Sequence, residues 1–313
     1  MIQVLLIFWI ITTLMVLREE KIARIIIYLG ILSLTASLCY LILGSPDVAM
    51  AEAATSAFTV IFFIICFEKY FDAGDVRNAA SAVKEKLYLL KVIIPIAFTV
   101  ITAYLFISSI PADTYNTYLR DRYLASFTWD VGGENPVTSI YLGYRVYDTL
   151  FEALIVVLAV VAAVHLSAFG DGGGKTDQHS EMEKSGMAVF AIQIICPVML
   201  LYGVYLIFNG HITPGGGFQG GLAIASFFIC RYMIYDINDL PIKKLNKMEE
   251  IVFVVITLFA ISIIFLGAAA YLPPNLRGIF NTVYMMLMNG LIGLKVACGF
   301  IILFYRYIVM EQK

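Results

Sequence analysis

The sequence predicts an all-α, polytopic membrane protein with about nine transmembrane helices, and two observations carry this prediction. The first is composition: 61% of the 313 residues are hydrophobic and 14% are charged, whereas a soluble domain has about 25% charged residues. The second is that the apolar residues form long runs, and about 20 such residues cross a bilayer as a helix. Helices satisfy their own backbone hydrogen bonds in lipid, so each run can span the membrane.

The apolar runs predict the spans in order along the chain. The expected ranges are 1–17, 22–44, 47–67, 90–109, 149–168, 187–208, 214–235, 249–271 and 282–308. Most of the 21 Lys and Arg residues fall in the odd-numbered connections between spans and at the end of the chain. Basic residues mark the cytoplasmic side. The N-terminus is therefore expected outside and the C-terminus in the cytoplasm.

Two hydrophilic segments divide the predicted spans into groups. The expected units are a three-helix unit (1–70), a two-helix unit with an external loop (71–170), a Gly-rich linker (171–185) and a four-helix unit (186–313). The linker has no strand before it, so its glycines predict a flexible connection rather than a phosphate loop.

Cysteine and histidine are too scattered to predict a metal or redox centre. The five cysteines lie within apolar runs without a C-x-x-C pair, and there are only three histidines. Zinc, iron–sulfur and haem sites need closely spaced ligands. The chain is therefore expected to carry no cofactor and no metal, apart from a transient Na⁺ at a carboxylate within a span.

The segment SPDVAMAEAA (45–54) places two carboxylates at the start of the third span. Asp47 follows Ser45 and Pro46, which suit a helix start, and its charge complements the positive end of the helix dipole. Glu52 lies about 7–8 Å deeper by helical rise. A carboxylate there must be paired, hydrated or protonated. Asp47 therefore has a structural explanation, and Glu52 is a candidate for an ion or proton pathway.

The segment YRVYDTLFEALIVVLA (144–159) carries a second group of charges. Arg145, Asp148 and Glu152 are spaced i, i+3 and i+7, which aligns them on one helix face. Either Arg145 pairs with Asp148 at the interface and Glu152 belongs to the helix start, or the three form part of an ion pathway. In the second case Glu152 is the functional member and, like Glu52, could bind Na⁺ transiently.

Lys295 lies near the middle of the last span, in MNGLIGLKVACGFIILF (288–304). At that depth its ammonium group cannot reach the interface comfortably, so it must find a counter-ion or lose its proton. Lys295 is therefore a candidate for proton transfer or for a movable counter-ion. The alternative is a static ion pair with a carboxylate of another helix or subunit.

The segment GHITPGGGFQGG (210–221) contains the G-x-G-x-x-G spacing of dinucleotide-binding loops. A nucleotide site of that kind requires a preceding strand, and an apolar run long enough for a membrane helix precedes it instead. The apolar stretch after Gly221 ends at Arg231, so the helix is expected to begin earlier, with Thr213 as its cap and Pro214 as its first residue.

The glycines of this segment would then serve helix packing. Gly216 with Gly220, and Gly217 with Gly221, form two ridges of small residues that allow another helix to approach closely. His211 lies near the outer end of the span and is expected to be hydrogen-bonded structure.

Three motifs of the chain resemble one family, in order. SPDVAMAEA is similar to the P-D-V-A-L-T-E-A segment in the C-terminal part of the A subunit of Mrp-type Na⁺/H⁺ antiporters and in the D subunit of membrane-bound hydrogenases. YRVYDTLFE resembles F-R-G-F-D-T-L-G-E, which follows it there or lies in the hydrogenase E subunit. GHITPGGGFQGG and IGLKVACG resemble signatures of the antiporter B subunit, called F in the hydrogenases.

The resemblance covers roughly residues 20–310 and implies a fusion of the D, E and F units. Ala51 and Phe151 depart from the family pattern, which has Thr and Gly there. The positions that fall on family motifs, and that the resemblance therefore makes candidates for an ion or proton pathway, are Asp47, Glu52, Arg145, Asp148, Glu152, His211 and Lys295.

The resemblance also implies a function and partners. The chain would be a non-redox membrane subunit of a multi-subunit complex in the prokaryotic cytoplasmic membrane, contributing to Na⁺/H⁺ antiport. Its partners would be a large antiporter-like subunit and other Mrp-type subunits, with membrane lipid around them and no nucleic acid. A fused chain favours coupling to a hydrogenase-like or a ferredoxin- or sulfur-linked oxidoreductase. The alternative is a structural scaffold in a stand-alone antiporter, without its own ion path.

Overall fold

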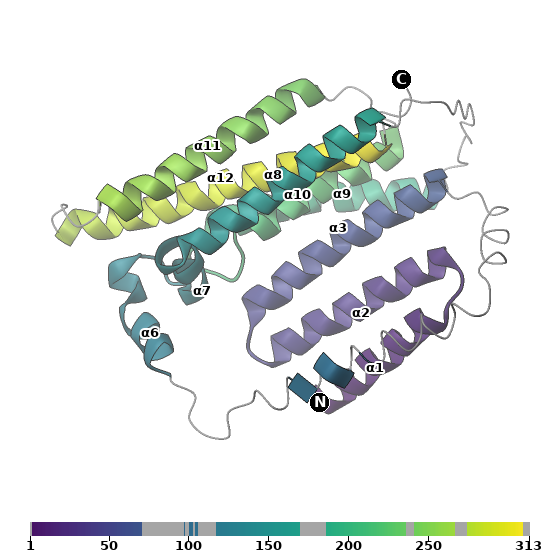
Figure 1. The fold of residues 1–313 in the computed structure, drawn as a ribbon, viewed down its shortest axis with the longest axis horizontal. Coiled ribbons are helices and arrows are strands. Elements are labelled where there is room, and N and C mark those ends of the chain that lie inside the picture. Colours follow the sequence, from purple (N-terminus) through teal and green to yellow (C-terminus); the bar gives the residue numbers. More distant parts are fainter. Residues whose placement is uncertain are drawn as a thin grey trace. The chain divides into compact units, whose positions relative to one another are not determined.

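The computed structural model describes residues 2–70, 117–169, 186–235, 241–266 and 274–308, with a few positions between 97 and 105. Every regular element in these ranges is a helix (Figure 1). Five of the helices are long and apolar enough to cross a membrane. The prediction of an all-α, polytopic membrane protein is therefore confirmed, while the total of nine spans and their orientation remain predictions.

The helices carry the labels of Figure 1. In chain order they are α1 (Ile2–Arg18), α2 (Ile22–Ile42), α3 (Pro46–Tyr70), α6 (Tyr118–Asp130), α7 (Pro136–Ser139), the π-helix η2 (Ile140–Tyr144), α8 (Val146–Phe169), α9 (Gly186–Asn209), α10 (Gly217–Tyr235), α11 (Ile242–Leu266) and α12 (Pro274–Ile308). The predicted span 90–109 and the predicted linker 171–185 lie largely or wholly outside the described residues.

Chain contacts divide the protein into two units. The first comprises residues 1–67 and 126–313, and the second comprises residues 68–125. The described part of the second unit comprises the last three residues of α3, a few positions between 97 and 105, and residues 117–125, which include the first part of α6. All the helices discussed below belong to the first unit.

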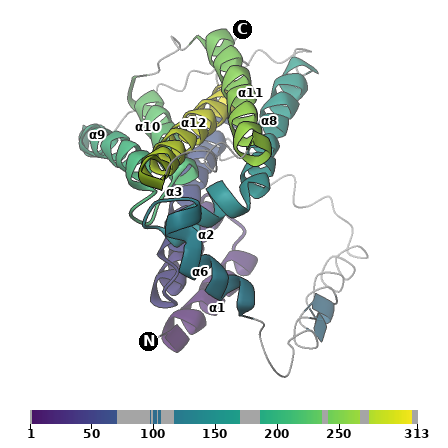
Figure 2. The same ribbon diagram turned by 90° about the vertical axis from the view of Figure 1, so that its left-hand side faces the viewer.

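In the first unit α12 is the central helix of a bundle. It contacts α8, α9, α10 and α11, and Figure 2 shows it between these helices. Its side chains Met285, Met288, Ile302 and Phe304 are fully buried. By contrast, α9 exposes large apolar side chains along its length, including Phe190, Ile194 and Leu201. Burial at the centre and apolar exposure outside are expected of a bundle surrounded by lipid.

The helices α1, α2 and α3 form the N-terminal part of the same unit (Figure 1). α1 contacts α2, and the Ser37 hydroxyl of α2 donates to the Ala49 carbonyl of α3 at 2.7 Å. Gly44, between α2 and α3, has a φ of 76°, a conformation that glycine adopts without strain. Pro46 then occupies the first position of α3, where its missing N–H costs no hydrogen bond.

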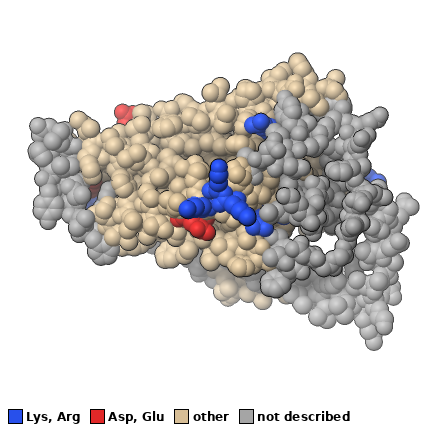
Figure 3. Space-filling view, turned by 90° about the horizontal axis from the view of Figure 1, so that it is seen from above, with Lys and Arg blue, Asp and Glu red and all other residues tan. Residues whose placement is uncertain are grey.

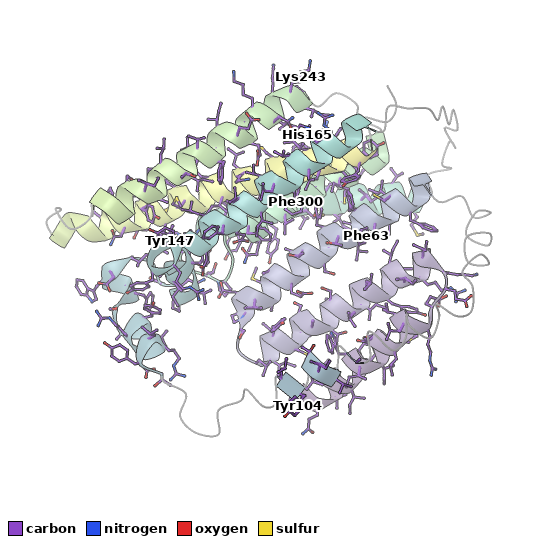
Figure 4. All side chains as sticks on the ribbon, in the orientation of Figure 1. Phe63, Tyr104, Tyr147, His165, Lys243 and Phe300 are labelled. Carbon is purple, nitrogen blue, oxygen red and sulfur yellow. The ribbon has the colours of Figure 1, made fainter. Side chains whose placement is uncertain are left out.

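Aromatic rings join α3 to the bundle. The ring centroids of Phe58 on α3 and Phe300 on α12 are 4.7 Å apart in an edge-to-face arrangement; Figure 4 labels Phe300. One turn further along both helices, the rings of Phe62 and Phe304 are 6.3 Å apart. These pairs advance together, so α3 and α12 run in the same direction.

Charged side chains are sparse on the face shown in Figure 3, where Lys and Arg gather in a small cluster. Lys243, Lys244 and Lys247, in the first two turns of α11, are exposed; Figure 4 labels Lys243. α11 thus begins with a polar segment and continues into the apolar one that predicted the span.

Candidate ion pathway

Lys295 of α12 and Glu249 of α11 form an ion pair in the core of the bundle. The Lys295 Nζ lies 2.6 Å from the Glu249 Oε1, and the two side chains are 0% and 3% exposed. The ring of Phe253, one turn after Glu249, lies 5.5 Å from Nζ. Removing two charges from water costs several kcal/mol, which only their mutual attraction offsets. Each side chain therefore depends on the other to remain charged.

Glu52 of α3 lies against α2, where the Ser33 hydroxyl donates to its Oε1. The side chain is half-buried between the two helices. A serine hydroxyl stabilises a carboxylate by one hydrogen bond without neutralising its charge. Glu52 is therefore solvated by a polar group but has no cation beside it among the residues that the structure describes.

Arg145 and Asp148 form an ion pair at the start of α8, and both side chains are more than half exposed. Arg145 precedes the helix, with φ of −124° and ψ of 37°, so the three charges do not share one continuous helix face as the spacing predicted. Glu152 is exposed on the first turns of α8. In the described chain no cation pairs with it, so the interfacial pair and Glu152 are separate features.

Glu52 lies at about the depth of the buried ion pair. Phe58 on α3 contacts Phe300 on α12, and the two helices run in the same direction. Six residues before Phe58 is Glu52, and six residues before Phe300 is Leu294, the neighbour of Lys295. Equal helical rise along both helices therefore brings Glu52 level with Lys295.

Glu152 lies at about the same depth on α8, which also packs against α12. Tyr141, just before α8, donates its hydroxyl to the Asn289 Oδ1 at 3.3 Å. Further along, a Cβ at Gly299 would lie 2.7 Å from the Val156 Cγ1. α8 and α12 therefore run in the same direction, and Glu152 falls level with the α12 residues between these two contacts. The Lys295–Glu249 pair lies within that interval.

Asp47 belongs to a different cluster, at the start of α3. Its Oδ1 accepts hydrogen bonds from the Asn135 Nδ2 at 2.9 Å and from the Gly215 N–H at 3.2 Å. The same Asn135 Nδ2 lies 3.1 Å from the Thr213 carbonyl oxygen, and the Asn135 Oδ1 caps α7. Asp47 is 8% exposed. It thus joins α3 to α7 and to the loop before α10.

His211 takes part in this cluster through its backbone. Its carbonyl oxygen accepts hydrogen bonds from the N–H groups of Glu134 and Asn135, at 2.8 and 3.0 Å. The neighbouring Gly210 carbonyl accepts from the Thr138 hydroxyl at 2.6 Å. The His211 ring is 7% exposed, and its Nδ1 has no hydrogen-bond partner in the described part of the protein.

The glycine motif enters α10 later than the sequence predicted. The helix begins at Gly217 rather than at Pro214, and Thr213 donates to the Asn209 carbonyl instead of capping α10. Gly215 and Gly216 have φ values of 149° and 155°, a backbone conformation that residues other than glycine rarely adopt. Gly216 therefore lies before the helix and does not form a ridge with Gly220. A Cβ on Gly216 would also collide with the Tyr141 hydroxyl.

The other glycines of the motif lie at helix contacts. A Cβ at Gly217 would be 2.5 Å from the Asn289 carbonyl oxygen of α12, and one at Gly221 would be 2.6 Å from that of Gly293. A Cβ at Gly220 would be 2.6 Å from the Gly203 carbonyl oxygen of α9. α10 is thus held between two helices by close backbone contacts of the kind that small residues permit.

Asn289 is fully buried on α12 and connects α10 with η2. Its Oδ1 accepts from the Gly217 N–H at 3.1 Å, one of the unpaired donors at the start of α10. The same oxygen accepts from the Tyr141 hydroxyl at 3.3 Å. The Asn289 Nδ2 has no partner among the described atoms.

Tyr141 lies in the π-helix, whose wider turn frees backbone carbonyls. The Tyr141 carbonyl accepts from the Thr149 hydroxyl at 2.6 Å, and the Leu142 carbonyl accepts from the Tyr284 hydroxyl at 3.0 Å. Burial raises the pKa of the Tyr141 phenol, and the charges of Asp47 and Glu152 raise it further. Tyr141 therefore stays protonated and lies within electrostatic reach of both carboxylates.

Sequence reasoning missed three residues of this arrangement. Glu249 is the first residue of the predicted span 249–271, so a carboxylate at an apolar boundary was visible as a signal. Asn289 is a polar residue within the last span, in the same segment (288–304) as Lys295. No sequence pattern pointed to Tyr141, because its contacts depend on the π-helix and on the packing against α12.

A resident metal centre would need several ligands at one point. No three His, Cys, Asp or Glu residues among the described side chains come together in that way. Oxygen ligands suit a hard cation such as Na⁺, and Glu52 and Glu152 offer carboxylate oxygens of that kind.

Two family models match the chain. Residues 187–302 match a domain related to the MnhB subunit of the Na⁺/H⁺ antiporter, and residues 7–71 match MbhD, the D subunit of MBH. A putative antiporter subunit mnhA2 of Staphylococcus saprophyticus is 26% identical over 153 residues, which cover 48% of this chain and 18% of that protein. The curated relatives that it matches are covered over 18 to 56% of their length.

Two solved structures share the fold. A chain in the structure of the Mrp complex from Dietzia sp. DQ12-45-1b is 14% identical with a TM-score of 0.75, over 97% of this chain and 34% of that one. A chain of the membrane-bound sulfane sulfur reductase, an archaeal respiratory membrane complex, is 22% identical with a TM-score of 0.54, over 68% of this chain and 96% of that one. The protein thus joins an MbhD-like segment and an MnhB-like domain in one polypeptide, the make-up of a fused Mrp-type antiporter subunit.

Proposed function

We propose that the chain contributes an ion path to a Na⁺/H⁺ antiport complex, with Glu52 and Glu152 binding the proton or Na⁺. The observation that carries this proposal is the common depth of Glu52, Glu152 and the Lys295–Glu249 pair. Ionisable side chains are costly within a membrane span and are kept there mainly for function. Four of them lie at one depth, on α3, α8, α11 and α12, which is more than a single structural ion pair requires.

Lys295 and Glu249 would act as the switch of this path. When a proton reaches Glu249, the carboxylate becomes neutral and Lys295 loses its counter-ion. The ammonium group must then turn to another carboxylate or release its proton, because an unpaired buried charge is strongly disfavoured. Either response changes the charge felt by a cation at the same depth, which links proton movement to Na⁺ movement.

The parent complex would be a respiratory one in the cytoplasmic membrane. The MbhD match of residues 7–71 and the fold shared with an archaeal respiratory membrane complex support this part of the proposal. Because the matched chain of the Mrp complex is much longer than this one, a large antiporter-like subunit would be a separate partner here. The chain itself would carry no cofactor.

The test is transport by the complete complex in membrane vesicles. Glu52→Gln and Glu152→Gln should each lower Na⁺-dependent proton movement by about tenfold or more, since neither helix offers a second ionisable group at that depth. The double variant Lys295→Gln/Glu249→Gln should do the same while keeping the core neutral. Glu250→Gln, at the exposed neighbour of Glu249, is the matched control and should transport normally.

Two other outcomes are informative. Normal transport in all three variants would rule the ion path out. Loss of the assembled complex on a native gel, before any change in transport per complex, would favour the alternative that the chain is a structural scaffold. The hydrogen bonds of Asp47 with Asn135 and with the Gly215 N–H, which join α3 to other elements, are the observation that favours such a role for part of the molecule.

A further inference from the structure

The hydroxyl of Tyr141 donates to the Asn289 Oδ1 and borders the loop that holds Asp47. On one side it touches Gly216, where any Cβ would collide with it. The next residue back, Gly215, donates its N–H to the Asp47 carboxylate at 3.2 Å. The phenol tip therefore borders the polar cluster around Asp47.

Glu152 lies on α8, the helix that follows Tyr141 in the chain. The Thr149 hydroxyl donates to the Tyr141 carbonyl at 2.6 Å, which places the start of α8 directly beside Tyr141. Glu152 lies about one turn further along α8, and helical side chains lean toward the N-terminus of their helix. The Glu152 side chain is thus expected to lean toward the N-terminal end of α8, the end that Tyr141 precedes.

Two buried polar atoms have no partner in the described part of the chain, one beside the Tyr141 hydroxyl and one on a residue of the Asp47 cluster. They are the Asn289 Nδ2, on the side chain that accepts the Tyr141 hydrogen bond, and the His211 Nδ1. Buried polar atoms of this kind bind internal water. Water held by either group would extend the reach of the Tyr141 hydroxyl toward the carboxylates.

We propose that the Tyr141 hydroxyl relays protons between Glu152, at the depth of the buried ion pair, and the cluster around Asp47 at the start of α3. This inference rests on the proposed ion path and names its outer step. In each transfer the Tyr141 O–H bond breaks as its proton moves to one side, and a new O–H bond forms with a proton from the other side. Tyr141 ends the step neutral, so no oxidant or co-reactant is needed.

The experiment compares Tyr141→Phe with Tyr284→Phe in the complete complex. Both changes remove one buried hydroxyl, but the Tyr284 hydroxyl donates to the Leu142 carbonyl and faces no carboxylate among the described residues. Initial rates of proton movement after a Na⁺ pulse are measured in vesicles across the pH range of activity. Complex yield and melting temperature are recorded for both variants.

Tyr141→Phe should lower the maximal rate by about tenfold with the apparent Na⁺ affinity unchanged, and should make the rate depend more steeply on proton concentration. Tyr284→Phe should match the wild type in rate and pH profile. If Tyr141→Phe keeps the wild-type rate and pH profile while Glu152→Gln is impaired, the relay is wrong and the ion path stands. If Glu152→Gln also transports normally, the ion path itself fails.

Discussion

Lys295 and Glu249 are each buried because the other is present. A lysine or glutamate alone in this core would face Phe253 and apolar helix surfaces without a counter-charge. Removing one member of a buried pair is therefore far more damaging than removing both. This asymmetry separates the pair from the exposed Arg145–Asp148 contact, which water already solvates.

A double-mutant cycle on the buried pair should show this asymmetry. Lys295→Gln or Glu249→Gln alone should lower the free energy of unfolding by about 3–5 kcal/mol, and the double variant should recover most of that loss. The measurement is the melting temperature of the purified complex. Arg145→Gln with Asp148→Asn is the control cycle, where each change should cost about 0–1 kcal/mol. Additive losses at Lys295 and Glu249 would show that the two charges do not depend on each other.

At the scale of helices, the position of α10 depends on backbone contacts that only glycine permits. Gly221 packs its Cα against the Gly293 carbonyl of α12, and Gly220 packs against the Gly203 carbonyl of α9. Any side chain at these positions pushes α10 away from a neighbour. Since α12 also carries Lys295, such a shift would reach the ion pair.

Gly221→Ala should therefore destabilise the complex by about 1–3 kcal/mol, the usual cost of overpacking. Gly290→Ala is the matched control, because a Cβ there meets nothing within 4 Å and alanine suits a helix better than glycine by about 0.5–1 kcal/mol. Melting temperatures of the two variants should move in opposite directions. Equal melting temperatures would mean that α10 and α12 can separate without cost.

The sequence predicts the helices that contain long apolar runs. It predicts helix boundaries and short helices poorly, because these depend on tertiary contacts. α11 begins at Ile242, before the predicted 249. The prediction missed its first turns because lysines interrupt the apolar residues there, so that no continuous apolar run marks them. α12 begins at Pro274, before the predicted 282, since proline suits a first helical position. The helices α6, α7 and η2 were not predicted, because they lack a long apolar run.

The candidate site, too, was predictable from the sequence only in part. The sequence pattern identified Glu52, Glu152 and Lys295, because an ionisable residue stands out within an apolar run. Their common depth was not visible, because it depends on the register of α3 and α8 against α12. The partner of Lys295 and the contacts of Tyr141 likewise come from helices distant in sequence.

At the scale of the whole molecule, two features indicate what must surround the protein. The outer helices present apolar side chains, as lipid or another membrane subunit would demand, and Glu152 is exposed within a helix apolar enough to span the membrane. A carboxylate cannot face lipid at that depth without a large cost. In the proposed ion path, an exposed Glu152 needs a neighbouring subunit, so the four ionisable groups would form one segment of a longer path.

Purification from the native membrane in mild detergent should therefore yield a complex that includes a large antiporter-like subunit. Co-purifying iron–sulfur or nickel–iron subunits, identified by mass spectrometry and metal analysis, are expected if redox chemistry drives the ion path. Small Mrp-like membrane subunits without metal would instead indicate a secondary antiporter, with the same residues serving Na⁺/H⁺ exchange. A protein that emerges alone and monodisperse would contradict the modular interpretation, because the exposed Glu152 would then have no subunit to complete its path.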